Sequence, residues 1–450
     1  DSEKAISVAR ALVANPRHPT LNNPEKSKSS AHYGVQSLVR LLKSLELWKE
    51  ALAFEKDGLI TTSGKNLRLN IEIFELLSRA FYVTGDRGRL QDLVSPVTKV
   101  RDAKAKQKTE AEEKAREAAI KKHGKGRKIE KGKKDPVEEA VAKAGKKFDS
   151  DLKKLNRLLE NTASFTAELA GDSKKASELT PQANDLWEAR RALKLGKKQD
   201  ALLKMAQNAV KSDKQETAPL ANATFLLAEL GKEDEAKVAF EKLRAISAQI
   251  NLNARPFSRL APLAKKFGFP SDWRLDHRAS DNLLPRPDLA SFGELHWTPP
   301  VSPGFSLPDQ HGKEISLANY RGKPLVLIFY LGAGCLHCTE QLTAIADRYA
   351  DFEKAKLPVL AISTDAVSDL KKSQDNYSKG TIPFPIVSDH GKSIFKAYTA
   401  HDDFENEPLH GTFILDGKGR VLWNDISADP FMDLDFLIKE AVRLLKLHKL

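Results

Sequence analysis

The 450-residue sequence has only two cysteines, and no apolar run approaches the roughly 20 residues that a membrane-spanning helix needs. It therefore predicts no membrane span. Two cysteines also leave no second Cys pair for a four-ligand zinc site. The chain begins without Met and without a signal-like segment, so we expect that it starts inside a longer precursor or after processing.

Acidic residues are fewer than basic ones, which gives the chain a formal net charge of +12. The excess is local: residues 101–147 hold 17 Lys and Arg against 9 Asp and Glu, a net +8, whereas residues 296–450 hold 17 against 20, a net −3. No aromatic residue interrupts the basic tract to stack on a base. The pattern favours a solvated segment over a polyanion-binding arm and argues against a nucleic acid partner.

Helical periodicity dominates the first part of the chain. Residues 1–30 begin with a helix-compatible stretch, Glu3–Val13, then become polar and contain prolines, and are predicted to be a lead-in. Residues 31–250 show apolar residues at helical spacing. Within them, a Gly followed five residues later by Ala occurs at Gly196 and again 35 residues on at Gly231. This spacing resembles the tetratricopeptide repeat, in which stacked helix pairs present a binding surface. An irregular helical domain is the alternative.

Two segments interrupt or end the helical region. The tract 101–147 is predicted as a charged insertion, with Ala103–Lys122 a solvated helix or disordered and His123–Lys134 a flexible loop. Residues 251–300 lose the periodicity and contain several prolines, which predicts a linker that can pack on both neighbours through its Trp and Phe residues.

Both cysteines lie in one short motif, Cys335-Leu-His-Cys338, after the apolar run 324–331 and a Gly-rich turn. A strand, a turn and two cysteines three apart place both sulfurs in the first turn of a helix. There the unpaired backbone N–H groups and the helix dipole favour a thiolate, which is the reactive form. At this spacing the two sulfurs can also close a disulfide.

Other interpretations of the two cysteines fit less well. Buried structural cysteines would not explain the spacing. A zinc site would have to recruit His337, His311 or His390. A c-type haem attachment needs His after the second cysteine, where Thr339 stands. Redox chemistry is the favoured interpretation, with no cofactor and no metal.

Residues 301–450 alternate strand and helix patterns and predict an α/β domain with a mixed sheet and helices on both sides. The segments that lend it a family likeness are Phe305–Asp309, Gly312-Lys313, Arg321–Pro324, Phe329-Tyr330, Phe384–Asp389 and Gly411–Asp416 with Gly419. In these pieces the domain resembles the peroxiredoxin/alkyl hydroperoxide reductase branch of the thioredoxin superfamily. The resemblance covers about a third of the chain and implies a thioredoxin fold and thiol-dependent peroxidase or oxidoreductase activity.

The resemblance allows two alignments of the cysteines. Matching the peroxiredoxin motif puts Cys338 at the peroxidatic position, with Cys335 where the family has Thr and His410 where it has an Arg. Both family residues donate hydrogen bonds to the peroxide. Matching the C-x-x-C motif instead makes Cys335 the attacking thiolate and Cys338 the resolving one, with His410 where thioredoxins have a cis-Pro.

Departures elsewhere in the motif concern Leu331, Gln341 and Gly334, which replace a family Pro, a family Glu and the thioredoxin Trp. Secondary candidates for a role at the site are His337, which could stabilise a thiolate when protonated, and Glu340, which could transfer a proton. For each, a solvated position in the first helical turn is an equally good interpretation.

The sequence thus predicts a multidomain protein: an all-α, tetratricopeptide-like array followed by a thioredoxin-fold domain at 301–450. Its catalytic residues would be Cys335, Cys338 and His410. A peroxide or a protein disulfide would be the substrate, an external dithiol the reductant, and the helical region would bind a protein partner. The alternative is a scaffold protein whose redox domain is mainly structural. A lone dithiol suits the cytosol or the periplasm, and we favour an extracytoplasmic compartment such as the bacterial periplasm.

Overall fold

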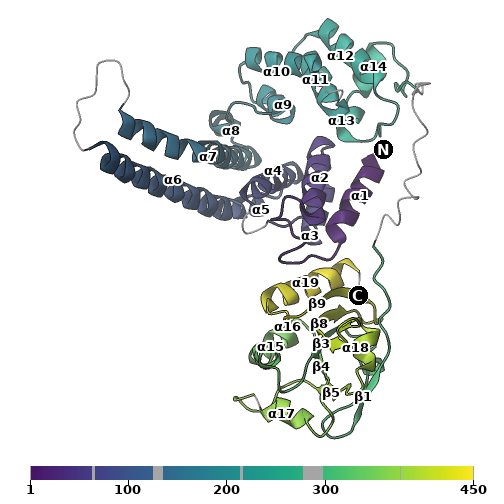
Figure 1. Cartoon of the computed structure of the whole chain (residues 1–450). Helices are drawn as coiled ribbons and strands as arrows, with labels where there is room; N and C mark the ends of the chain where they lie inside the picture. The colour runs from purple at the N-terminus through teal and green to yellow at the C-terminus, as the bar shows by residue number, and fades with distance from the viewer. Residues whose placement is uncertain are drawn as a thin grey trace. The chain divides into compact units, whose positions relative to one another are not determined.

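A computed structural model of the protein describes residues 2–62, 66–124, 135–212, 216–276, 297–375 and 377–448. Contacts divide it into two compact units (Figure 1). The helical unit comprises Asp1–Arg10 and His32–Ser291, and the α/β unit comprises Ala11–Ala31 and Phe292–Leu450. The α/β unit is therefore assembled from two separate parts of the sequence.

Helices make up the regular structure of the first unit in its described residues. They are α1 (Ser2–Ala14, which runs on into the segment Ala11–Ala31), α2 (Ser30–Ser44), α3 (Trp48–Lys56), α4 (Leu67–Thr84), α5 (Arg87–Asp92), α6 (Val94–His123), α7 (Pro136–Leu169), α8 (Ser173–Leu179), α9 (Leu186–Lys194), α10 (Gln199–Lys211), α11 (Thr217–Glu229), α12 (Glu233–Ala245), α13 (Arg255–Ser258) and α14 (Ala261–Lys266). The all-α prediction for this region is confirmed.

The two repeat copies correspond to the helix pairs α9–α10 and α11–α12. Gly196 and Gly231 follow the first helix of each pair with φ near +71° and +72°, a left-handed conformation that glycine adopts without steric cost. The copies differ in packing, because Ala236 is buried while Ala201 is exposed. A tetratricopeptide array remains a prediction for this region.

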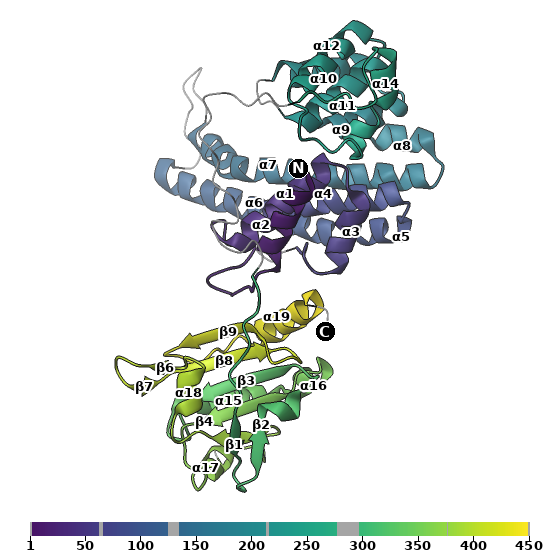
Figure 2. The ribbon, with the colours of Figure 1, turned by 90° about the vertical axis from the view of Figure 1, so that its right-hand side faces the viewer.

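The charged tract forms most of the long helix α6 (Val94–His123) and the first third of α7 (Pro136–Leu169), and the two helices lie side by side in both views (Figures 1 and 2). Ion pairs such as Lys108–Asp149 at 2.7 Å join them. Ala103–Lys122 is therefore helical and packs against a partner helix. The partner could not be predicted from the sequence, because the segment has almost no apolar face. Most of the loop expected at His123–Lys134 lies outside the described residues.

The chain after Asn251 packs into the helical unit rather than running as a bare linker. Trp273 is fully buried, and its ring lies 4.9 Å from that of Phe240, centroid to centroid. Arg244 Nε donates a hydrogen bond to the carbonyl of Trp273 at 2.8 Å. Residues 251–276 of the predicted 251–300 linker therefore pack into this unit and place Phe257, Leu260 and Trp273 in its core, and residues 277–296 lie outside the described ones.

The α/β unit is built around one mixed sheet. Its elements are β1 (Ser306–Pro308), β2 (Glu314–Ser316), the 3-10 helix η2 (Leu317–Tyr320), β3 (Leu325–Tyr330), α15 (Leu336–Asp347), α16 (Tyr349–Lys354), β4 (Val359–Ser363), α17 (Leu370–Asp375), β5 (Ile386–Ser388), α18 (Ser393–Ala397), β6 (His401–Asp402), β7 (Glu407–Pro408), β8 (His410–Leu415), β9 (Val421–Ser427) and α19 (Leu434–Leu447). The strand order is β5-β4-β3-β8-β9. The first three strands are parallel, whereas β8 and β9 run antiparallel to their neighbours. The predicted mixed α/β sheet is confirmed.

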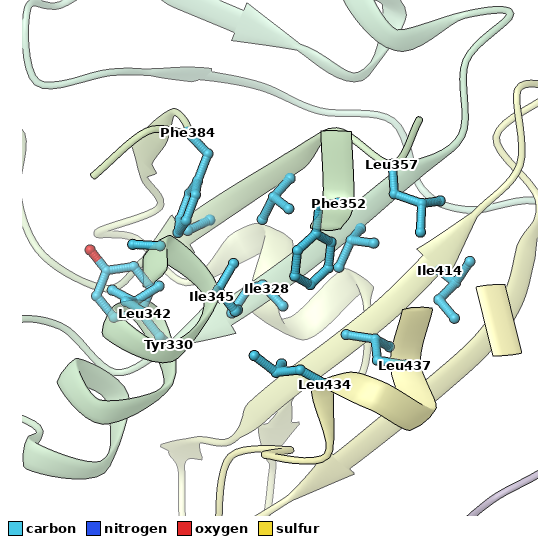
Figure 3. Packing of buried hydrophobic residues seen from close by; sticks show 14 of the residues in the cluster. Ile328, Tyr330, Leu342, Ile345, Phe352, Leu357, Phe384, Ile414, Leu434 and Leu437 are labelled. Carbon is cyan, nitrogen blue, oxygen red and sulfur yellow. The ribbon is translucent and has the colours of Figure 1, made fainter. Parts of the chain in front are cut away.

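Every side chain of the central strand β3 is buried. Val326, Ile328 and Tyr330 face a cluster closed by α15, α16 and α19, which Figure 3 shows from close by. The alternate residues, with Phe329 among them, face a second cluster that includes Phe395 of α18. Alternation of side chains along a strand thus places one apolar run in two cores, which explains why 324–331 shows no polar position.

The segment Ala11–Ala31 packs on the outer strand β9 and on α19. The indole Nε1 of Trp423 donates to the carbonyl of Arg17 at 2.7 Å, and the backbone N–H of Arg17 donates to Glu440 at 2.8 Å. The guanidinium of Arg443 donates to the carbonyl of Asn15 at 2.9 Å. The segment expected to be a lead-in is therefore an integral part of the α/β unit.

Substitution of Phe352 tests the core over α15 and α16. Phe352 is fully buried, so Phe352→Ala should lower the free energy of unfolding of the α/β unit by about 3–5 kcal/mol. Phe404→Ala is the matched control, since Phe404 is 92% exposed and its loss should change that free energy by less than about 0.5 kcal/mol. Hydrogen exchange of peptides that cover β3 and β4 measures both. Equal effects of the two substitutions would contradict this assignment of the core.

Candidate functional site

The dithiol motif lies where β3 ends and α15 begins. β3 and β4 are parallel, so their carboxyl ends meet at one edge of the sheet, and the turn Gly332–Gly334 leads from that edge into the helix. Gly332 has φ near +99°, and a Cβ built there would lie 2.3 Å from a carboxylate oxygen of Asp365. Only glycine fits this position, so the turn that aims the cysteines depends on it.

Cys335 is the N-cap residue of α15 and is half-buried. Its sulfur accepts a hydrogen bond from the backbone N–H of Cys338 at 3.2 Å. The sulfur of Cys335 therefore lies at the N-terminus of α15, at the positive end of the helix dipole. The structure thus places the thiol of Cys335 at the start of the helix, where the sequence predicts it.

Cys338 has a different environment. It is fully buried, and its sulfur accepts a hydrogen bond from the N–H of Leu331 at 3.3 Å. Burial, together with the hydrogen bond to Cys335, raises the pKa of the Cys338 thiol far above its usual value. Cys338 is therefore a protonated thiol at neutral pH in this conformation, while Cys335 is the sulfur that solvent can reach.

His410, from the start of β8, lies against both sulfurs. Its Nε2 is 3.2 Å from the sulfur of Cys338 and 3.6 Å from that of Cys335. The residue is buried, and this burial lowers the pKa of the imidazole, although Asp429 and the carbonyl of Ala428 act in the opposite direction. The ring is therefore neutral at pH 7. Its Nδ1 is buried without a hydrogen-bond partner of ordinary geometry among the described residues.

The secondary candidates lie outside this cluster. The side chain of His337 is 63% exposed, and its Nδ1 is 3.9 Å from a carboxylate oxygen of Asp429, which is itself exposed. Glu340 is exposed on α15. Gln341 is buried instead: its amide donates to the carbonyl of Phe431 at 2.9 Å and to the hydroxyl of Thr412 at 3.3 Å. Gln341 thus links α15 to β8 beside His410.

Asp365 was missed by the sequence analysis. Its carboxylate accepts a hydrogen bond from the N–H of Ala333 at 2.9 Å and so holds the turn before the cysteines. The neighbouring Thr364 donates its hydroxyl to the carbonyl of Leu331 at 3.0 Å. Polar residues directly after β4 could have signalled this role, because parallel strands end at the same edge of the sheet.

The different exposure of the two thiols predicts an order of alkylation. When the reduced protein is treated briefly with iodoacetamide at pH 8, Cys335 should be labelled well before Cys338. Raising the pH to 9 should not reverse the order, because a raised pKa leaves the Cys338 thiolate scarce at both values. Peptide mass spectrometry measures the labelling. Faster labelling of Cys338 would show that this arrangement of the thiols is wrong.

In the described part of the chain, no helix is both long and apolar enough to cross a membrane.

Comparison with known proteins places the α/β unit. Residues 301–424 match the AhpC/TSA family. A chloroplastic peroxiredoxin Q of Suaeda salsa is 34% identical over 157 residues, which is 34% of this chain and 72% of that protein. A chloroplastic peroxiredoxin Q of Triticum aestivum is 38% identical over 122 residues, 27% of this chain and 55% of that protein.

Among solved structures, peroxidoxin BcpB of Mycobacterium tuberculosis aligns over 34% of this chain and 98% of its own, with 24% identity and a TM-score of 0.30. The family assignment rests on the sequence relatives and not on this alignment. The matches cover about a third of the chain, and the chain spans about half the length of the wheat relative. Through its α/β unit, the chain belongs to the AhpC/TSA family of peroxiredoxins.

Proposed function

We propose that the protein is a thiol peroxidase in which Cys335 and Cys338 alternate between a dithiol and a disulfide. The observation that carries the proposal is the clustering of both sulfurs and Nε2 of His410, all within 4.8 Å of one another at the start of α15. The peroxiredoxin names of the relatives support peroxide as the oxidant and imply a reductant. An external dithiol would supply the electrons.

In the proposed first step, the thiolate of Cys335 attacks one oxygen of the peroxide. An S–O bond forms, the O–O bond breaks, and the leaving oxygen takes a proton to become water or an alcohol. Cys335 is then a sulfenic acid. The half-buried position of Cys335 at the helix N-terminus supports its role as the first nucleophile, whereas the buried and protonated Cys338 would be a poor one.

The second step closes the disulfide. Cys338 must lose its proton to attack the sulfenic sulfur, and the neutral Nε2 of His410 lies 3.2 Å away, within reach to accept it. An S–S bond then forms, the sulfenic oxygen leaves as water, and an external dithiol returns both thiols by exchange. His410 would thus act as a general base for Cys338, in place of the peroxide-binding Arg of the family.

Single variants separate these steps. With pre-reduced protein and peroxide, Cys335→Ser should form no sulfenic acid, whereas Cys338→Ser should form one per chain and then stop. His410→Asn should slow disulfide closure by roughly 10²–10⁴-fold while leaving sulfenic acid formation almost unchanged. Dimedone trapping and stopped-flow kinetics measure the two steps.

The reverse pattern has a clear meaning. If only Cys338→Ser abolishes the sulfenic acid, Cys338 is the peroxidatic residue, as the peroxiredoxin alignment has it. If no variant and no wild-type protein reacts faster than a free thiol, the alternative of a scaffold protein with a structural redox domain is favoured.

A protein disulfide is a second candidate substrate. Leu336, beside the half-buried Cys335, is 70% exposed, and such an apolar side chain next to a reactive thiol suits contact with another polypeptide. In this reaction the thiolate of Cys335 would form a mixed disulfide, which Cys338 would resolve. Reduction of insulin disulfides by the same variants distinguishes the two substrates.

For the helical unit we propose a role in binding an acidic segment of a protein partner. A cavity of about 670 Å³ is lined by residues of α2, α4, α7, α9, α10 and α11. Most of its acidic groups are paired: Glu46 with Arg190 and Arg259, Glu75 with Lys43, and Asp185 with Arg79.

Two exposed cations, Arg40 and Lys154, line the same cavity, while the exposed Arg68 is paired with Glu72 at 3.6 Å. With the acids already neutralised, the cavity favours a ligand of negative charge. The proposal is independent of the reaction at the cysteines.

A fluorescent poly-glutamate peptide tests the helical unit. The double variant Arg40→Glu/Lys154→Glu should bind the peptide roughly tenfold more weakly than the wild type, and added salt should weaken wild-type binding. Lys153→Glu is the matched control, because Lys153 is exposed on the same helix but does not line the cavity. Equal weakening by both variants, measured by fluorescence anisotropy, would exclude the cavity as the binding site.

A further inference from the structure

Two thiols and one imidazole nitrogen converge at the start of α15. The sulfurs of Cys335 and Cys338 and Nε2 of His410 all lie within 4.8 Å of one another. Nitrogen-to-sulfur distances are 3.2 Å for Cys338 and 3.6 Å for Cys335. Thiolate and imidazole are the donors that zinc and other borderline-soft cations prefer in proteins.

The spacing of these donors suits a single tetrahedral ion. With Zn–S of about 2.3 Å and Zn–N of about 2.0–2.1 Å, tetrahedral angles separate a sulfur from a nitrogen by about 3.6 Å and two sulfurs by about 3.8 Å. The distances in the protein lie within a few tenths of an ångström of the first value. The three donors would therefore need only small side-chain rotations to share an ion.

The surroundings leave a fourth coordination position open. Cys338 and His410 are buried, so they supply fixed ligands from inside, while Cys335 is half-buried and borders solvent. Three protein ligands with a fourth position for water are the pattern of zinc sites that exchange ligands.

We propose that the reduced protein binds one Zn²⁺ ion, or a cation of the same class, through Cys335, Cys338 and His410. Two Zn–S bonds and one Zn–N bond form, the two thiol protons pass to solvent, and no electron is transferred. Thiolates held by the metal cannot join in a disulfide, and a disulfide offers no thiolate ligand. Metal binding and oxidation of the pair therefore exclude each other, whichever cysteine reacts first with a peroxide.

Zinc titration of the reduced full-length protein, in competition with a chromophoric chelator and without oxygen, tests the site. The wild type should bind one ion per chain, and oxidation with diamide, which closes the disulfide without a peroxidase reaction, should abolish binding. His410→Ala should lower the affinity by about 100-fold or more, since even loss of an outer-shell partner costs about 10–100-fold. With Co²⁺ as the probe, thiolate-to-metal charge-transfer bands should appear in the wild type.

Two further variants keep the test decisive. His337→Ala, which removes the exposed histidine between the two cysteines, should change the affinity by less than about twofold. His410→Cys should restore a third ligand and with it most of the affinity lost in His410→Ala, which separates loss of a ligand from damage to the fold. One ion per chain in the double variant Cys335→Ser/Cys338→Ser, or wild-type affinity in His410→Ala, would overturn the proposal. Either result would leave the proposed peroxidase reaction untouched.

Discussion

The geometry of the site depends on the antiparallel pairing of β3 with β8. Phe329 pairs with Gly411 in this register, so His410 stands opposite the end of β3, where the dithiol turn begins. Side chains alternate along a strand, and a slip of one residue would turn the imidazole to the other face of the sheet. Gly411 supports the register, because a Cβ there would lie 2.9 Å from the ring of Phe413 and 3.3 Å from that of Phe329. Backbone pairing thus decides which residue meets the sulfurs.

Seen together, the departures from the family motif make one consistent change. In the alignment that puts Cys338 at the peroxidatic position, Cys335 and His410 stand where the family has a Thr and an Arg that donate hydrogen bonds to the peroxide. Both residues lie next to Cys338: the sulfur of Cys335 is 3.2 Å from its backbone nitrogen, and Nε2 of His410 is 3.2 Å from its sulfur. In the proposed reaction these two residues supply the sulfur that is oxidised first and the base for Cys338, in place of donors to the peroxide.

Much of the α/β unit could be predicted from the sequence, because its elements are marked by strong local patterns. The apolar run 324–331 contains β3 (Leu325–Tyr330), and apolar residues at helical spacing mark α19 (Leu434–Leu447). The helix that begins after Cys335 ends at Asp347, and α16 begins at Tyr349, a break that no Gly or Pro marks in the sequence. The contact of Asp365 with the turn before the cysteines and the contacts of His410 with both sulfurs could not be predicted, because they join strands that are far apart in the sequence. From the sequence, the histidines proposed as further zinc ligands are His337, His311 and His390. His410 becomes a candidate ligand only in the fold, because the pairing of β8 with β3 places it beside the cysteines.

Residues 11–31 give the α/β unit an unusual order of assembly. The bond between the backbone of Arg17 and Glu440 joins residues 423 positions apart, and the whole helical unit from His32 onward is inserted between the two parts of the α/β unit. During synthesis on a ribosome, the segment emerges long before β9 and α19 exist, so its Trp423 and Glu440 partners reach it last. The helical unit can fold before residues 11–31 have a partner, and the docking of these residues on β9 and α19 then completes the folding of the α/β unit. A nascent chain that stops before α19 would leave the polar backbone of Asn15 and Arg17 exposed to chaperones and proteases.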